Sequence, residues 1–95
     1  MNLYAITVPN TRGLLNIFEN VALDLAGGYT FVGLTSGSWR DDTGTVHTDK
    51  MALYHIACTA PIFKRVVTLA FKLFPTELAI FTAKLGTATI VTREG

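Results

Sequence analysis

The sequence has 95 residues, which is enough for one hydrophobic core and too few for two. Eight Lys and Arg residues against seven Asp and Glu residues leave a formal charge of +1, so the chain lacks the basic excess on which binding to nucleic acid rests. Hydrophobic residues make up 49% of the chain, and so high a share in so short a domain predicts that another copy covers part of the apolar surface. We expect a single domain over residues 1–95 and no nucleic-acid partner.

No membrane contact is expected, because polar residues interrupt every apolar stretch before the roughly 20 residues that a spanning helix needs. Residues 1–4 show neither a charged leader nor a cleavage-like site. Cys58 is the only cysteine, so an internal disulfide is excluded. These features predict a cytoplasmic protein.

The first half of the chain predicts a strand, a helix and a second strand. Residues 3–8 alternate two sets of side chains, as a strand does, and both sets carry apolar groups. The next apolar residues recur at intervals of four, three and four, as on one face of a helix; they are Leu14, Phe18, Val21 and Leu25. Thr11 is the expected cap of this helix, Gly27-Gly28 its end, and Glu19 is expected to face solvent. Residues 29–35, rich in β-branched and aromatic side chains, predict the second strand.

The second half begins with a polar stretch, residues 36–49, which predicts a long connection. Residues 51–58 predict a third strand, and Thr59-Ala60-Pro61 then begins a second helix. The apolar stripe of this helix is expected to be buried; it comprises Ile62, Val66, Leu69, Ala70 and Leu73. Two short strands, 78–83 and 87–92, are expected around a turn at Lys84-Leu85-Gly86.

This order predicts an α+β, ferredoxin-like β-α-β-β-α-β sandwich with an extra C-terminal strand. Both helices cover one face of an antiparallel sheet in this arrangement. Whichever alternate set of strand residues points away from the helices, apolar groups such as Tyr4, Ile6, Leu53 or Ile56 are left uncovered. The edges of a small sheet also favour association. We therefore expect a homotrimer whose sheets line a central core.

The middle of the chain holds most of the residues that could carry chemistry: Trp39, Arg40, His47, Asp49 and Lys50. A tryptophan beside charged groups is typical of a pocket for a flat heteroaromatic ring. The alternative is that Trp39 closes over the sheet edge while the charges keep the connection solvated. His47 and Asp49 would point to the same side of an extended chain, but two ligands do not make a metal site. No metal and no cofactor are expected.

Motifs of common enzyme classes are missing from the sequence. Gly33 and Gly37 are not followed by the lysine or the spacing of a phosphate-binding loop, and there is no nucleophile elbow. Cys58 is expected to be a buried small hydrophobe. Motifs alone therefore do not identify an enzyme.

The layout of strand, helix, strand, polar connection, strand, helix and hairpin resembles the trimeric PII-like branch of ferredoxin-like folds. Within that branch, residues 35–41 (Thr-Ser-Gly-Ser-Trp-Arg-Asp) and 48–50 (Thr-Asp-Lys), which lead into 51–58, are similar to the small S-adenosylmethionine lyases of bacteriophages. Those lyases have a Gly-x-Tyr-Arg-like turn and a Glu-Lys-type entry to the third strand. The tyrosine and glutamate belong to their active site at the subunit interface, and these positions fall here on Trp39 and Asp49.

The resemblance implies a cytoplasmic phage protein that binds an adenosine-containing small molecule, such as a nucleotide or S-adenosylmethionine, between subunits as a counter-defence. Trp39 would stack on the adenine, and Asp49 would accept hydrogen bonds. Arg40, His47 and Lys50 would meet the charged end of the ligand. Two alternatives stay open: an S-adenosylmethionine lyase active in anti-restriction, with Asp49 as its catalytic carboxylate, and a structural or protein-binding trimer.

Overall fold

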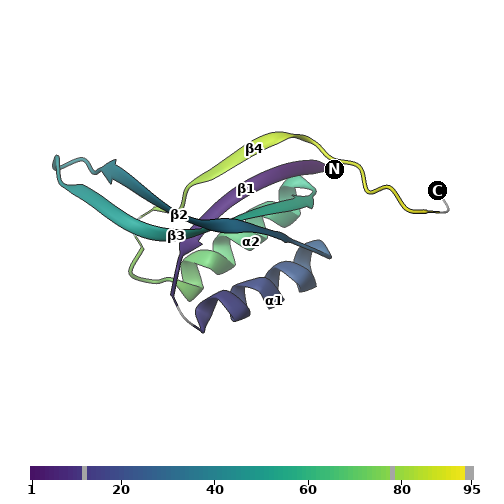
Figure 1. Cartoon of the computed structure of the whole chain (residues 1–95), viewed down its shortest axis with the longest axis horizontal. Coiled ribbons are helices and arrows are strands. Elements are labelled where there is room, and N and C mark those ends of the chain that lie inside the picture. Colours follow the sequence, from purple (N-terminus) through teal and green to yellow (C-terminus); the bar gives the residue numbers. More distant parts are fainter. Residues whose placement is uncertain (12, 78, 94–95) are drawn as a thin grey trace.

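Two helices cover one face of a four-stranded sheet in the computed structural model, which describes residues 1–11, 13–77 and 79–93 (Figure 1). The elements in chain order are β1 (Asn2–Pro9), α1 (Leu14–Ala26), β2 (Thr30–Arg40), β3 (Val46–Cys58), α2 (Ala60–Leu73) and β4 (Thr82–Thr87). The strands lie in the order β2-β3-β1-β4, and all neighbouring strands are antiparallel. The predicted ferredoxin-like α+β fold is confirmed.

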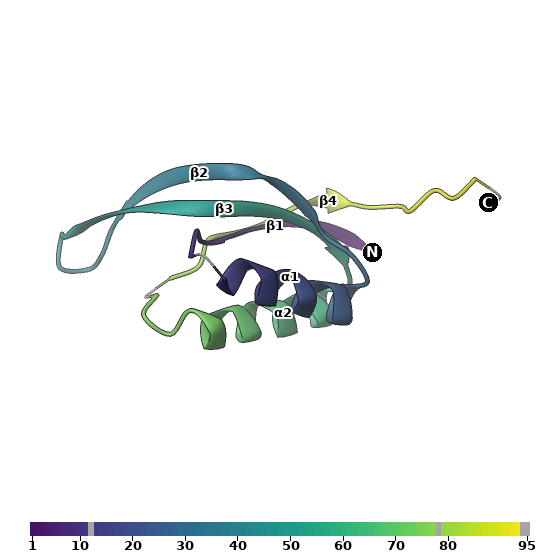
Figure 2. The ribbon, with the colours of Figure 1, turned by 60° about the horizontal axis from the view of Figure 1, so that its bottom comes forward.

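Both helices lie on the same side of the sheet, as Figure 2 shows. Gly27 ends α1 in the left-handed conformation, with φ 81°, and donates its N–H to the carbonyl of Leu23 at 2.9 Å. Thr11 is not the cap of α1, as was expected, because Gly13 occupies that position. The carbonyl of Thr11 instead accepts the N–H of Leu14 in the preceding turn. No helix in the described residues is long and apolar enough to cross a membrane.

The core lies between the helices and the even-numbered side chains of β1 and β3. Antiparallel pairing sets Ile6 beside Tyr54 and Tyr4 beside Ile56, so these side chains share the helix-covered face. Fully buried core residues are Ile6, Val8, Phe18, Ala22, Ala52, Tyr54, Ile56, Val66 and Ala70. Burial of Phe18 and Val66 was predicted, whereas Phe63, which stacks on Tyr4 at a centroid distance of 4.0 Å, lay outside the predicted stripe. Ala70 of that stripe is also buried in the core, Ile62 and Leu73 pack at its margin, and Leu69 is half-buried.

Glu19 does not point to solvent as expected. The Tyr54 hydroxyl donates to one of its carboxylate oxygens at 2.6 Å, and the Tyr29 hydroxyl donates to the other at 3.1 Å. Burial raises the pKa of Tyr54, and the hydrogen bond to Glu19 raises it further. The hydrogen bond that Tyr29 donates to Glu19 is the main cause of the raised pKa of Tyr29. The buried Tyr54 ring needs a partner for its polar end, and Glu19 supplies that partner from α1.

The prediction of a long polar connection over residues 36–49 is wrong. β2 continues to Arg40 and β3 begins at Val46, with Arg40 paired to Val46, so the turn spans only residues 41–45. This part of the hairpin extends beyond the helices, and its side chains are mostly solvent-exposed. The polar residues of this stretch therefore belong to two paired strands that no helix covers, and not to a loop.

The end of the sheet also differs from the prediction. One strand, β4, replaces the two that were expected, and Lys84-Leu85-Gly86 lies within β4 and not in a turn. A register shift in the pairing with β1 accommodates the extra residue, since Lys84 pairs with Tyr4 and Gly86 with Leu3. The first expected strand began at residue 78, which lies outside the described residues. The described residues after β4 form no further strand.

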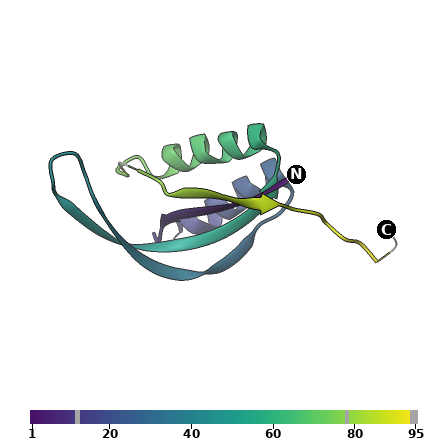
Figure 3. The ribbon, with the colours of Figure 1, turned by 90° about the horizontal axis from the view of Figure 1, so that it is seen from above.

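The molecule is elongated, with principal extents of 52 × 27 × 23 Å. The β2–β3 hairpin projects at one end, and residues 88–93 project at the other (Figures 1 and 3). Neither projection is covered by the helices. Both projections therefore lie outside the core that the helices and the sheet enclose.

Candidate functional site

The sheet face opposite the helices, here called the open face, carries the odd-numbered side chains of β1 and β3. Its residues are Leu3, Ala5, Thr7, Met51, Leu53, His55 and Ala57. Ala5 is buried and the others are half-buried, so neighbouring side chains cover them only partly. Tyr4, Ile6 and Ile56 face the helices instead. Both faces of these strands thus carry apolar side chains, and Leu3, Met51 and Leu53 are the large apolar residues of the open face.

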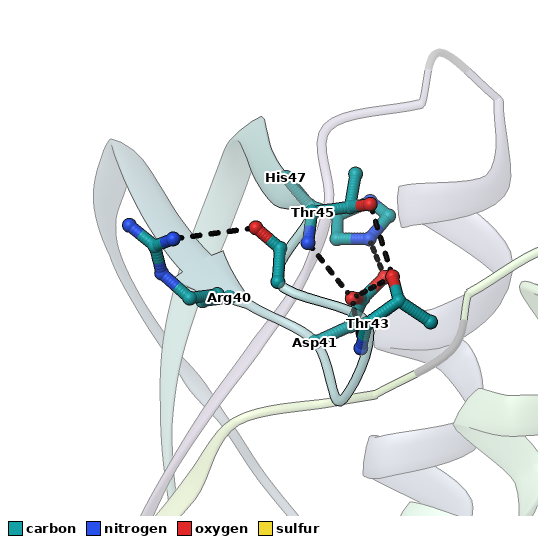
Figure 4. A network of polar contacts seen from close by, with 6 residues as sticks. Arg40, Asp41, Thr43, Thr45 and His47 are labelled. Atoms are coloured by element: carbon teal, nitrogen blue, oxygen red, sulfur yellow. Dashed lines mark hydrogen bonds and ion pairs between the residues drawn. The ribbon is translucent and has the colours of Figure 1, made fainter.

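A compact turn closes the hairpin and is organised by Asp41 (Figure 4). One oxygen of its carboxylate accepts the backbone N–H of Thr43 at 2.9 Å, the hydroxyl of Thr43 at 2.6 Å and the backbone N–H of Thr45 at 3.0 Å. Arg40 donates to the carbonyl of Gly44 at 3.3 Å. Short polar residues of this kind satisfy the backbone of a tight turn, which explains the Asp-Asp-Thr-Gly-Thr sequence.

The other oxygen of Asp41 lies 2.8 Å from Nε2 of His47. The hydrogen bond from Thr43 is the main cause of the lowered pKa of Asp41, and the contact with His47 lowers it further. The ring face of His47 stacks on Trp39, with ring centroids 4.6 Å apart. Trp39 and His47 are cross-strand partners, so the stack joins β2 to β3 just before the turn.

A pocket of about 440 Å³ opens beside Trp39. Its walls come from the end of β1, from β2 and β3 of the hairpin, and from the segment before β4. The described lining residues are Thr7, Thr35, Ser36, Gly37, Ser38, Trp39, Asp49, Met51, Ala79, Ile80 and Phe81. Most of this surface is apolar, and Asp49 is the one ionisable residue among the described lining residues.

A second carboxylate lies near Asp49. Burial raises the pKa of Glu77, the negative charge of Asp49 raises it further, and His47 acts in the opposite direction. Glu77 precedes the pocket segment 79–81 along the chain. Asp49 is the charged group that an occupant of the pocket would meet among the described lining residues, and its carboxylate favours a positively charged partner.

The five expected site residues do not converge on one site. Trp39 and Asp49 line the pocket, and His47 lies behind the Trp39 ring. Arg40 binds the turn, and Lys50 pairs with Ser36 on the strand face opposite Asp49. Because neighbouring residues of a strand point to opposite faces, Asp49 and Lys50 do not contact one ligand from the same side.

The pocket residues from distant parts of the chain were missed by sequence reasoning. Thr7 and the segment 79–81 reach the hairpin only because β1 and the chain before β4 run beside it. Met51 could have been predicted as a pocket residue, because it lies two residues after Asp49 and therefore points to the same face of β3. Cys58 is buried as predicted, and burial raises the pKa of its thiol. Within residues 1–11, 13–77 and 79–93, no three His, Cys, Asp or Glu side chains are placed to hold a metal ion.

Comparison with solved structures gives a consistent match. The divalent cation tolerance protein CutA1 of Thermus thermophilus has a TM-score of 0.72 at 20% identity, covering 98% of this chain and 88% of its own. CutA of Xylella fastidiosa has a TM-score of 0.66 at 19% identity, covering 99% and 90%. This chain has the CutA1 fold. The periplasmic divalent cation tolerance protein CutA of Archaeoglobus fulgidus matches at a TM-score of 0.67 and 12% identity, covering 98% and 88%. By sequence, neither a protein-family model nor a curated protein matches the chain.

The expected adenosine-binding or S-adenosylmethionine lyase function is wrong: the solved structures that match this chain are described as CutA and divalent cation tolerance proteins, and none of those compared here is described as a lyase or a nucleotide-binding protein. The resemblance to PII-like proteins holds at the level of the fold, which the CutA1 proteins share, but no link to phage lyases is found. The order of elements belongs to a fold that hosts many functions. The Gly-Ser-Trp-Arg segment that suggested a lyase turn lies within β2. The cytoplasmic location stays a prediction, since one protein with the CutA1 fold is described as periplasmic.

Proposed function

We propose that this protein assembles as a homotrimer through its open face and acts, once assembled, in tolerance of divalent cations. The observation that supports the proposal is the structural correspondence with a divalent cation tolerance protein over 98% of the chain. At 20% identity that correspondence concerns the fold, so the cation function is carried over as a hypothesis.

The open face supports self-association. A sheet in a small α+β domain buries one face against its helices, and an apolar second face needs another cover. Leu53 lies on an inner strand of the sheet, between Thr7 of β1 and Gly33 of β2, and no helix lies over it. Packing against the open face of another copy would remove Leu53 and Met51 from water. The high hydrophobic content of the sequence is consistent with burial of the open face between copies.

Assembly also bears on how a cation is held. Transition-metal ions in proteins take about four nitrogen, sulfur or oxygen ligands, and the described residues of one copy offer no group of three. His55 lies on the open face, whereas His47 is already engaged by Asp41. A trimer joined through the open face would bring one His55 from each copy into the interface. We therefore propose His55 as a cation ligand that depends on assembly.

Light scattering on the purified protein tests the assembly. A mass three times that of the chain is expected, and Leu53→Lys should release monomers because it places a charge in the interface. Leu23→Lys is the matched control, since Leu23 is 46% exposed on α1. A wild-type protein that stays monomeric at micromolar concentration contradicts the proposed assembly.

Titration calorimetry with Cu²⁺ and Zn²⁺ tests the ligand. His55→Ala should lose binding while His47→Ala keeps it. Expression in a copper-sensitive bacterium then tests the function: the wild type should raise the Cu²⁺ concentration that permits growth, and Leu53→Lys should not. A trimer that neither binds these ions nor changes growth overturns the cation role.

A further inference from the structure

We propose that the pocket beside Trp39 binds a small aromatic amine, whose ammonium group pairs with Asp49 while its ring lies against the apolar walls. This site goes beyond the proposed cation role, which depends on assembly through the open face and on His55. The open face and the pocket share Thr7 and Met51, and the rest of the described lining lies on the hairpin and on the segment before β4.

The floor of the pocket is one face of the β2–β3 hairpin. Thr35, Gly37 and Trp39 are alternate residues of β2, so they belong to the same face of the strand. On β3, Asp49 pairs with Gly37, and Met51 pairs with Thr35. Because residues that pair across two strands share a face, Asp49 and Met51 belong to this floor too.

Gly37 leaves an empty space beside Asp49. The position opposite the carboxylate, between Thr35 and Trp39, has no side chain, and a Cβ atom there would meet no heavy atom within 4 Å apart from its neighbours in the chain. The φ angle of Gly37 is not positive, so the backbone does not require glycine. A glycine inside a strand weakens the strand and often marks the close approach of a ligand. Gly37 therefore keeps open the space that an ammonium group would occupy.

The segment before β4 forms the facing wall. Thr7 of β1 donates its N–H to the carbonyl of Phe81 at 3.0 Å, which ties this segment to the sheet. Phe81 is 69% exposed and Met51 is half-buried, so both leave apolar surface in water. The volume of about 440 Å³ is within the range of small-molecule pockets. An apolar ligand of that size would cover the exposed surface.

Asp49 determines the charge of the ligand. Its carboxylate is the one ionisable group among the described lining residues, and Lys50 lies on the opposite face of the strand. In the described part of the chain, no lysine, arginine or histidine forms an ion pair with Asp49. An ammonium group carries three N–H donors, and hydrogen bonds from such donors to a carboxylate are about twice as strong as neutral ones. The lining thus favours an amine over a neutral or acidic molecule.

Trp39 favours an amine that is also aromatic. The stack with His47, at a centroid distance of 4.6 Å, fixes the position of the indole. Trp39 pairs with His47 and Asp49 pairs with Gly37, so Trp39 and Asp49 are diagonal neighbours, about 7–8 Å apart. A cation held by Asp49 is then within reach of the indole, which attracts cations to its face. The ring of the same ligand can pack against the Phe81 ring.

Titration of the wild-type protein with phenethylamine, followed by calorimetry, tests the site. Phenethyl alcohol is the matched neutral compound. The amine should bind at least about tenfold more tightly than the alcohol, because only the amine is charged at neutral pH. Trp39 is the only tryptophan, so its fluorescence should change when the amine binds. Equal affinity for the two compounds, or no binding of the amine at millimolar concentration, overturns the proposal.

A charge variant tests the role of Asp49. Asp49→Asn keeps the shape of the side chain, so it should lose the preference for the amine and keep the affinity for the alcohol. Asp42→Asn removes the same charge from the turn and should keep the preference, since Asp42 does not line this pocket. A preference for the amine that survives Asp49→Asn overturns the assignment of the ammonium group to this carboxylate.

A filling variant tests the pocket itself. Gly37→Val should abolish binding of both compounds, while the melting temperature should not fall, because valine favours strands and the space at this position is empty. Thr48→Val, on the opposite face of β3, is the matched control and should bind both compounds as the wild type does. Binding that survives in a folded Gly37→Val protein places the amine elsewhere and overturns the site. Asp49→Asn leaves the pocket volume unchanged, so it remains a test if Gly37→Val is unstable.

Discussion

Trp39 and His47 face each other across β2 and β3, with ring centroids 4.6 Å apart and ring planes inclined by 21°. A carboxylate oxygen of Asp41 lies 2.8 Å from Nε2, at the edge of the same imidazole. The three residues connect the turn of the hairpin to the wall of the pocket. The position of the pocket wall therefore depends on the order of the turn.

Replacing His47 by Ala should loosen this wall. Trp39 is the only tryptophan, so its fluorescence reports the hairpin alone. Losing the stacked imidazole exposes one face of the indole, and the emission should shift to longer wavelength. His55→Ala should leave the emission unchanged, because His55 pairs with Ala5 and Thr30 far along the sheet. An unshifted spectrum in His47→Ala contradicts the stack.

Acid should weaken the turn through Asp41. The hydrogen bonds from Thr43 and the contact with His47 lower the pKa of Asp41 below its ordinary value of about 3.9. The stability that this carboxylate contributes is fully present above the ordinary pKa and is lost as the pH falls below it. Melting temperatures measured from pH 6 to pH 2 should fall more in the wild type than in Asp41→Asn. Asp42→Asn, at the neighbouring position, should follow the wild type.

Removing the Tyr54 hydroxyl should destabilise the fold more than removing that of Tyr29. Tyr54 is fully buried, and its hydroxyl lies 2.6 Å from a carboxylate oxygen of Glu19. Tyr29 is partly exposed, and its hydroxyl lies 3.1 Å from the other carboxylate oxygen. A hydrogen bond to a charged group contributes about 1.5–3 kcal/mol, so Tyr54→Phe should cost an amount in that range. Urea unfolding at one protein concentration measures both variants. An equal loss of unfolding free energy in Tyr54→Phe and Tyr29→Phe would contradict the larger contribution expected from the Tyr54–Glu19 hydrogen bond.

Phe18→Ala should cost about 3–5 kcal/mol in the free energy of unfolding, because it empties the centre of the core. Phe18 is fully buried and packs against the Tyr54 ring at a centroid distance of 5.1 Å. Phe71→Ala is the control, since Phe71 is 40% exposed on α2. Thermal unfolding at a fixed concentration gives both values, and an unchanged melting curve for Phe18→Ala would contradict the packing of α1.

The sequence by itself determined the fold class, the two helices and the part of the core that the helices contribute, but not which face of the strands is buried. Periodic side chains decide which face of an element is apolar, and this is why Phe18 and Val66 were correctly expected in the core. The end of α1 at Gly27 followed in the same way from the residue types. Such features depend on neighbours within a few residues, and a single sequence displays them directly.

Only the tertiary structure decided the length of the hairpin and the make-up of the pocket. Residues 36–40 and 46–49 are polar because no helix covers them, and an uncovered strand has the composition of a loop. Thr7 and Ile80 reach Trp39 through pairings between distant strands, which no local pattern reports. Trp39 and Asp49 were expected at one site from their residue types and from the resemblance to the phage lyases. The alternation of the strand places Lys50 on the opposite face.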